Sequence, residues 1–250
     1  MSERYSRQIA FEGIGEEGQA KLLRSRVAII GLGALGTVAA NNLCRAGVGF
    51  IRIIDRDHVE LINLQRQTLY NEQDASSRLP KAEAAFSRLS KINSEITLEP
   101  VVADVNATNI ESLIHDVDLV LDCTDNIETR CLINEACDKL RKPWIYAGVL
   151  AGEGLTMNVI PGETACFRCL FPDPPLPGSY PTIVNVGVLN GVTAVIASVE
   201  STEAMKILLH SPEVRKNLFR IDVWNNISNY IDIEKNPDCP ICGRHEYETL

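Results

Sequence analysis

Four cysteines occur as two CxxC pairs, a spacing that can hold a metal ion or carry out redox chemistry. The stretch "CFRC" contains Cys166 and Cys169, and "CPIC" contains Cys239 and Cys242. Two such pairs in one chain, without a thioredoxin-like context, indicate a tetrahedral zinc (Zn) site with four thiolate ligands. Because four protein ligands leave no open position on the metal, we expect the zinc to be structural.

A second group of residues could bind a nucleotide. The stretch "GLGALG" contains Gly31, Gly33 and Gly36, and the next apolar run ends in the acid Asp55. A strand, a glycine turn, a helix and a second strand ending in an acid form the arrangement that binds dinucleotides. Backbone N–H groups at the helix start face the phosphates, and the acid accepts ribose hydroxyls. The pattern predicts a nucleotide site, with an ordinary glycine turn as the alternative.

The polar stretch "NLQRQ" suggests which nucleotide is bound. It contains Asn63, Arg66 and Gln67, and Lys81 follows Pro80 at a predicted helix start. Arginine presents a planar fork of donors to phosphate oxygens, and a helix N-terminus also favours anions. Two cations beside one phosphate chain favour a triphosphate, whose charge must be neutralised while a bond breaks. Either cation alone would be interpreted as part of a solvated basic loop.

The motif "DCTDN" adds a candidate magnesium (Mg) ligand. Asp125 follows a strongly apolar run, at the carboxyl edge of the predicted strand, where open α/β sheets bind ligands. Mg²⁺ is usually held by one or two carboxylates together with phosphate oxygens. We therefore predict that Asp125 binds Mg²⁺ and that Asp122 supports the site from behind. The alternative is that Asp125 only caps the following helix.

Alternating strands and helices must position these residues. Apolar patterning predicts strands at 26–31, 50–55, 97–105 and 118–125, and helices at 16–25, 34–47, 81–93, 106–117 and 126–140. This alternation predicts an α/β fold, with a Rossmann-like, doubly wound, mostly parallel sheet. Asn106 or Thr108 is expected to cap the fourth helix.

The pattern changes after residue 144. Two strands separated by Gly152 and Gly154 are expected at 144–160, followed by a helix at 191–209 and two strands within 217–235. These C-terminal strands are expected to be antiparallel. Residues 171–182 contain five prolines in "FPDPPLPGSYPT" and are interpreted as a crossing loop.

Composition limits the possible partners. The chain has 250 residues, of which 45% are hydrophobic, so a sizeable core can form without disulfides. A formal net charge of −9 argues against nucleic acid as the main partner. The charged N-terminal stretch and the lack of a long apolar run predict no secretory signal and no membrane span, and therefore a cytoplasmic protein. The remaining cysteines, interpreted as core residues, are Cys44, Cys123, Cys131 and Cys137.

Taken in order, the motifs resemble those of the MoeB/ThiF/HesA family of bacterial and archaeal relatives of the ubiquitin-activating enzymes. The matching stretches cover nearly the whole chain and are "RYSRQI", "GLGALG", "NLQRQ", "LPKAEAA", "DCTDN" and "CFRC…CPIC". Members of this family use MgATP to adenylate the C-terminal glycine of a small ubiquitin-like sulfur carrier ending in Gly-Gly. The match is closest to the ThiF/MoeB-type proteins of thiamine and molybdopterin synthesis.

The resemblance implies a role for each matched position. The residues implied to bind ATP are Gly31, Gly33, Gly36, Asp55, Asn63, Arg66, Lys81, Asp125 and Asn126. Of these, Arg66, Lys81 and Asp125 are implied to act in catalysis, the last by holding Mg²⁺. Arg7 matches an arginine that reaches into the ATP site of the partner subunit, which implies a homodimer.

The expected chemistry needs no general base. A terminal carboxylate has a pKa of about 3.3–3.7 and is already an ionised nucleophile at neutral pH. The sequence shows no histidine constellation. A non-catalytic ATP-binding scaffold or sensor and an enzyme that adenylates a small carboxylate remain alternatives. An NAD-dependent dehydrogenase is disfavoured because a catalytic His or Tyr-x-x-x-Lys is missing.

The resemblance implies one ThiF-type domain over residues 1–250. Its half at 1–142 would bind the nucleotide, and its half at 143–250 would bind the carrier and contain the crossing loop and the zinc site. In several relatives a cysteine that bonds to the carrier follows the Pro-rich loop. Here that position falls on or beside Ile183, where the nearby hydroxyl of Thr182 lacks thiolate character. We therefore expect a separate sulfur donor.

Overall fold

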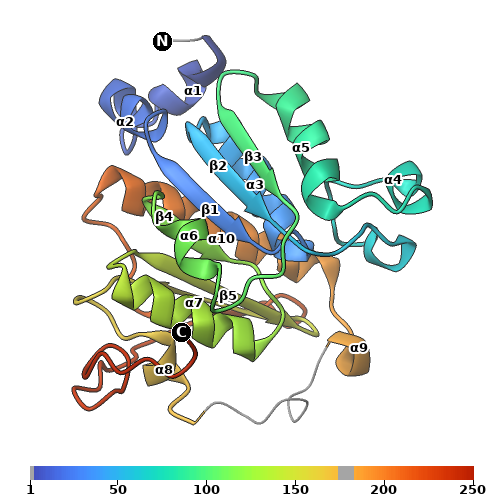
Figure 1. Cartoon of the computed structure of the whole chain (residues 1–250). Helices are drawn as coiled ribbons and strands as arrows, with labels where there is room; N and C mark the ends of the chain where they lie inside the picture. Colours follow the sequence, from blue (N-terminus) through green and yellow to red (C-terminus); the bar gives the residue numbers. More distant parts are fainter. Residues whose placement is uncertain (1–2, 174–182) are drawn as a thin grey trace.

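The computed structural model describes residues 3–173 and 183–250 (Figure 1). Its sheet has eight strands in the order β3-β2-β1-β4-β5-β6-β7-β8. The strands are β1 (Arg26–Ile30), β2 (Phe50–Ile54), β3 (Thr97–Val101), β4 (Leu119–Asp122), β5 (Trp144–Leu150), β6 (Glu153–Val159), β7 (Leu218–Asp222) and β8 (Ile227–Ile231). The Pro-rich crossing loop and Thr182 lie largely or wholly outside the described residues.

Helices connect and cover these strands. The α-helices are α1 (Ser6–Ile9), α2 (Gly15–Leu22), α3 (Ala34–Ala46), α4 (Glu72–Ser76), α5 (Lys81–Ile92), α6 (Ile110–Ile114), α7 (Ile127–Lys139), α8 (Phe167–Leu170), α9 (Ile183–Val186) and α10 (Asn190–Leu209). Two 3₁₀ helices are η1 (Glu3–Tyr5) and η2 (Leu61–Asn63). No helix in the described part of the chain is both long and apolar enough to cross a membrane.

The predicted sheet topology is confirmed. Strands β3, β2, β1, β4 and β5 are parallel, whereas β6, β7 and β8 pair antiparallel with their neighbours. Crossover connections through helices produce the parallel half, and short turns join β5 to β6 and β7 to β8 in the antiparallel half. The carboxyl ends of β1, β2 and β4 therefore meet at one edge of the sheet, directly before the three motifs of the predicted nucleotide site.

Both faces of the sheet are covered by helices. One hydrophobic cluster contains buried residues of α3, α5 and α10, among them Leu43, Leu89 and Ile196. The other cluster packs α6, α7 and the segment with the CxxC pairs against the opposite face, which Figure 1 shows in front of the sheet. Because both faces are buried, the central strands are apolar on both sides, as the unbroken runs of the sequence predict.

Helix ends follow local rules, with two differences from expectation. Helix α3 ends at Gly47, whose φ of +81° is the left-handed cap that favours glycine. Helix α6 is preceded by Asn109, so the expected capping by Asn106 or Thr108 is wrong. The Asn106 side chain instead accepts hydrogen bonds from Thr108 and closes a turn before the helix. Gly154, expected between two strands, lies within β6.

Candidate nucleotide and metal sites

The glycine turn and the acidic motif lie side by side at the carboxyl edge of the sheet. The Gly31 N–H donates to the Ile54 carbonyl at 2.8 Å, and the Cys123 N–H donates to the Ile30 carbonyl at 2.9 Å. These two bonds continue the parallel pairing of β1 with β2 and of β1 with β4 by one residue beyond the strand ends. The motifs that follow β1, β2 and β4 are therefore brought to one place, as their sequence positions predict.

Each of the three glycines is needed for a different structural reason. Gly31 has a φ of +93°, and a Cβ there would lie 2.6 Å from the Cys123 carbonyl oxygen. A Cβ on Gly36 would collide with the Gly31 carbonyl oxygen. Gly33 has an ordinary φ of −79°, and the nearest atom to an added Cβ is Gln67 Nε2 at 3.8 Å. Gly33 therefore leaves open space at the start of α3, where an anion can approach the backbone.

Asp55 is tied to the glycine turn. One carboxylate oxygen accepts from the Leu32 N–H at 2.6 Å, and the other accepts from the Asp57 N–H at 2.7 Å. Burial raises the pKa of Asp55, while these backbone bonds and the charge of Lys81 act in the opposite direction. The carboxylate is thus fixed beside the turn, where its remaining lone pairs can accept ribose hydroxyls.

Lys81 is anchored next to Asp55 through Asp57. Its N–H donates to the Asp57 carbonyl at 2.8 Å, and its Nζ lies 3.0 Å from Asp57 Oδ2. The Lys81 side chain is only 7% exposed, whereas that of Asp57 is 58% exposed. The ammonium group is therefore held in position at the start of α5 by a partner that water can still solvate.

Arg66 and Asn63 form a second polar group. The Arg66 Nη2 donates to Asn63 Oδ1 at 3.0 Å, and both side chains are partly buried. The next residue, Gln67, is 4% exposed, and its buried Oε1 has no hydrogen-bond partner among the described residues. Its Nε2 faces the open space at Gly33. Gln67 thus presents a donor on the side of the glycine turn, directly after Arg66 in the chain.

Asp125 is exposed and free to bind a ligand. Within the described part of the chain its carboxylate forms no hydrogen bond or ion pair. Asn126, and not Asp125, caps α7, because the Asn126 Oδ1 accepts from the Thr129 N–H at 2.8 Å. The alternative that Asp125 only caps this helix is therefore wrong. A free carboxylate at this edge fits a Mg²⁺ ion, which prefers oxygen ligands.

Arg130, which sequence reasoning did not identify, supports this turn from inside the protein. Its Nη2 donates to the Thr124 carbonyl at 2.7 Å, and its Nε lies 3.3 Å from Asp122 Oδ2. Asp122 is fully buried and also accepts from the Thr124 hydroxyl at 2.6 Å. These contacts place Asp122 behind the Asp125 turn, and its support of a metal site stays a prediction. A basic residue on the buried face of a helix was the available signal for Arg130.

Arg7 lies away from these residues. It is exposed on α1, which packs against α2. The neighbouring Gln8 donates to the carbonyl of Ala46, at the end of α3, and Tyr5 packs against Gly47. The ends of α3 and α5 face the beginnings of the strands, so α1 lies at the edge opposite the glycine turn (Figure 1). Arg7 is therefore not part of the group that its own chain assembles.

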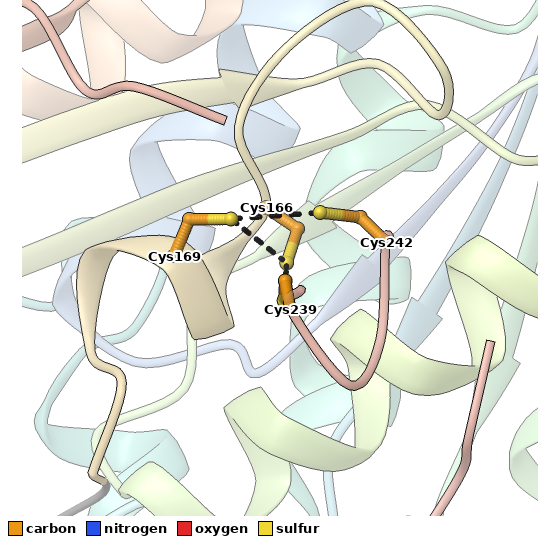
Figure 2. Close-up of side chains that lie close together, drawn as sticks. All are labelled: Cys166, Cys169, Cys239 and Cys242. Carbon is orange, nitrogen blue, oxygen red and sulfur yellow. Dashed lines mark hydrogen bonds between the residues drawn. The ribbon is translucent and has the colours of Figure 1, made fainter. Parts of the chain in front are cut away.

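The four CxxC cysteines converge on one point. Their sulfur atoms all lie within 4.8 Å of one another, and Figure 2 shows the side chains facing each other from α8 and the C-terminal loop. The Cys166–Cys239 and Cys169–Cys242 sulfur distances are 3.6 and 3.5 Å. Tetrahedral Zn–S bonds of about 2.3 Å would place the sulfurs about 3.8 Å apart. The cluster therefore fits zinc in both donor chemistry and size.

The remaining cysteines are largely buried, as expected. Cys44, Cys123 and Cys137 are buried, and Cys131 is half-buried. Burial raises the pKa of each of these thiols, that of Cys44 to about 11. The low content of thiolate disfavours covalent chemistry at these four cysteines.

The position expected for a carrier-linked cysteine lies at the start of a short helix. Ile183 begins α9, directly after the segment outside the described residues.

Comparison with known proteins is consistent with these features. The family model described as "ThiF family" matches residues 5–241. The sulfur carrier protein ThiS adenylyltransferase of Bacillus subtilis is 42% identical over all of this chain and 74% of its own length. The SAMP-activating enzyme E1 of Haloferax volcanii is 37% identical over 99% of this chain and 91% of its own length.

Solved structures share the fold. The crystal structure of E. coli MccB with ATP superposes with a TM-score of 0.83 at 24% identity, covering 97% of this chain and 75% of that chain. The crystal structure of PaaA superposes with a TM-score of 0.76 at 23% identity, covering 93% of this chain and 82% of that chain. Together with the family model and the relatives above, the evidence shows that this chain belongs to the ThiF family.

Proposed function

We propose that this protein is an ATP-dependent adenylyltransferase that activates the C-terminal glycine of a small ubiquitin-like sulfur carrier. The observation that carries the proposal is the meeting of four groups at one edge of the sheet. These are the glycine turn, the fixed Asp55 carboxylate, the anchored cations and the free Asp125 carboxylate. The relatives named as sulfur carrier adenylyltransferases support it. The products are the acyl-adenylate and pyrophosphate.

The residues of the site have complementary tasks in this reaction. Asp55 holds the ribose, and the start of α3 accepts the phosphates at Gly33. Arg66, with Asn63, and Lys81 stabilise the charge that develops on the departing pyrophosphate. Asn126 lies beside the nucleotide. A Mg²⁺ ion on Asp125 would supply further neutralisation of the phosphate oxygens. The incoming carboxylate is already ionised, so the chain only has to orient it towards the α-phosphorus.

The direct test is ATP–pyrophosphate exchange with and without a ubiquitin-like carrier that ends in Gly-Gly. We expect exchange that depends on both the carrier and Mg²⁺. ATP binding without exchange would instead favour a scaffold or sensor. Exchange with a small carboxylate, and none with a carrier, would identify a small-molecule ligase. Tight binding of NAD in place of ATP would contradict the assignment of the nucleotide.

A substitution at Gly33 separates nucleotide binding from folding. Since Gly33 has an ordinary φ and open space around an added Cβ, Gly33→Ala is expected to fold normally. The methyl group would occupy the position nearest to the phosphates, so ATP affinity should fall at least ~10-fold. Calorimetric titration with MgATP and thermal unfolding measure the two effects. An unchanged affinity would contradict phosphate binding at this turn.

We also propose a homodimer in which Arg7 acts in the partner's site. Arg7 lies at the edge of the sheet opposite its own glycine turn, so it can serve catalysis only through another copy. Arg7→Ala and Asp125→Ala are each expected to be inactive. Mixed dimers of the two variants should recover exchange, because one of their two sites contains both native residues. Verified mixed dimers without activity would show that Arg7 has no role in trans.

The sulfur is expected to come from a separate donor. The chain has Ile183 at or beside the position of the carrier-linked cysteine of its relatives. Its thiols outside the CxxC cluster are buried, except that of Cys131, which is half-buried. Incubation with carrier, MgATP and a sulfur source should therefore give no reductant-sensitive adduct by intact mass. A stoichiometric adduct mapped to a cysteine of this chain would refute this prediction.

The remaining assignments follow from the same proposal. The chain would form a single ThiF-type domain, in which residues 1–142 bind the nucleotide and residues 143–250 bind the carrier. A net charge of −9 does not favour nucleic acid. We place the reaction in the cytoplasm, since reduced thiols are needed for the zinc cluster.

A further inference from the structure

A glutamate is buried behind the carboxyl edge of the sheet, and no basic partner is found for it among the described residues. Glu200 lies on α10 and has no exposed surface. Both of its carboxyl oxygens lie 3.8 Å from the sulfur of Cys123, the residue that follows β4. Among the described residues, no lysine, arginine or histidine forms an ion pair with it. A buried carboxylate without a counter-ion is strongly disfavoured, so burial favours the protonated form of this group.

The surrounding charges favour the same protonation state. Burial raises the pKa of Glu200 well above its ordinary value, and the nearby carboxylate of Asp122 acts in the same direction. Among the described residues, the cation that pairs with one of these two acids is Arg130, which lies next to Asp122. The titratable groups that act on Glu200 are Asp122 and Cys123, both at the end of β4, and α10 packs against β4 and β5. Arg130 therefore pairs with Asp122 and leaves Glu200 without a cationic partner among the described residues.

Cys123 holds the carboxyl group of Glu200 in place. Its thiol can donate to either carboxyl oxygen, since both lie 3.8 Å from the sulfur. This contact alone lowers the pKa of Glu200, but burial and the charge of Asp122 outweigh it. A protonated Glu200 still offers its carbonyl oxygen to the thiol, so the contact does not need the charge.

Cys123 in turn touches the parts of the site that hold the nucleotide. A Cβ on Gly31 would lie 2.6 Å from the Cys123 carbonyl oxygen, and a Cβ on Gly36 would lie 3.3 Å from the Cys123 Cβ. The glycine turn is thus packed on Cys123 with no spare space. Two residues further on, the chain presents Asp125. A shift of Cys123 would move both sides of the site.

We propose that Glu200 is a positioning residue, a fully buried acid on α10 that holds the glycine turn and the Asp125 turn in register through its contact with Cys123. This inference deepens the proposed function and rests on it for its catalytic part. Ionisation of Glu200 would place a second, fully buried negative charge near Asp122, directly behind the Asp125 turn. Nucleotide binding and adenylation are therefore expected to weaken on the alkaline side.

The test is Glu200→Gln, which keeps the shape and is neutral at every pH. A group with a raised pKa in the folded state contributes stability below its unfolded pKa and loses it as the pH rises towards the folded value. The Gln variant should therefore gain melting temperature over wild type by at least ~3 °C at pH 8, with a smaller gain at pH 5. Wild type should show the infrared band of a protonated carboxyl at pH 7, and the variant should lack it.

Activity and binding test the positioning role. At pH 7 the Gln variant should bind MgATP and catalyse exchange within ~3-fold of wild type. Above the folded pKa wild type should lose kcat, approaching about tenfold per pH unit, while the variant stays active. Glu200→Ala, which removes the contact, should lower kcat at all pH values and lack this alkaline loss.

The matched control is Glu203→Gln, one turn further along α10. Burial opposes ionisation there, but hydrogen bonds from Lys206, the Arg215 N–H and Asn158 outweigh it and lower the pKa of Glu203. That variant should lose stability at pH 8. Equal pH dependence of stability and MgATP binding in wild type and Glu200→Gln would overturn the proposal. If wild type and the variants still differ in the pH dependence of stability and MgATP binding, but none of them catalyses ATP–pyrophosphate exchange, only the proposed adenylation is refuted.

Discussion

Replacement of Arg66 or Lys81 by alanine should lower the rate of carrier adenylation at least ~10²-fold, about the cost of removing one preorganised donor in other enzymes. Both side chains are held in position by the chain itself, Arg66 by Asn63 and Lys81 by Asp57. Because the donors are already in place, their stabilisation of the departing pyrophosphate needs no rearrangement. The loss should therefore appear mainly in kcat.

The stability of these variants should change little. Arg66 is only partly buried, and removal of Lys81 leaves Asp57, whose side chain is largely exposed and stays solvated. ATP–pyrophosphate exchange measures the rate, and thermal unfolding without ATP measures the stability. Lys139→Ala is the matched control, because this exposed lysine pairs with Glu111 at the far end of α7. Near-normal exchange in both site variants would contradict the assigned roles.

Loss of one zinc ligand should have the largest effect on stability. We expect about one zinc per chain in protein purified without chelator. Cys239→Ser or Cys242→Ser should lower the free energy of unfolding by at least about 3 kcal/mol, a fraction of what structural zinc sites contribute to folding. The cluster joins α8 to the C-terminal loop, and its cysteines belong to the hydrophobic cluster that packs on β5 and β6. Removing the metal would leave this face loosely packed.

Metal analysis and thermal unfolding with and without a chelator check this expectation. Cys131→Ser is the control, because Cys131 is a half-buried thiol on α7 outside the cluster. It should retain zinc and lose little stability. Protein that is fully folded and free of zinc, with a melting temperature that chelators do not change, would show that the cysteines serve another purpose.

Local sequence patterns determined the framework of this protein. The unbroken apolar runs before Gly31, Asp55 and Asp122 predicted parallel strands, since only a sheet covered on both faces needs such runs. Because parallel strands end at one edge, the order of the motifs was enough to predict that Gly31, Asp55 and Asp125 meet. The CxxC spacing predicted the cysteine cluster for a different reason. The two pairs lie 73 positions apart in the chain, but four thiolates in two such pairs are the ligand set of one tetrahedral zinc ion.

Only the tertiary structure decided how these groups are supported. The Asp57–Lys81 pair, the buried Arg130 behind Asp122 and the contact of Glu200 with Cys123 join residues 8 to 77 positions apart. Their burial depends on which helix face packs on which strand, and hydrophobic periodicity does not show which polar side chains will lack water. The place of Arg7 at the opposite edge also needed the packing of α1. Patterns along the chain report secondary structure and strand ends, whereas the protonation state and pairing of a buried side chain depend on everything that surrounds it in space.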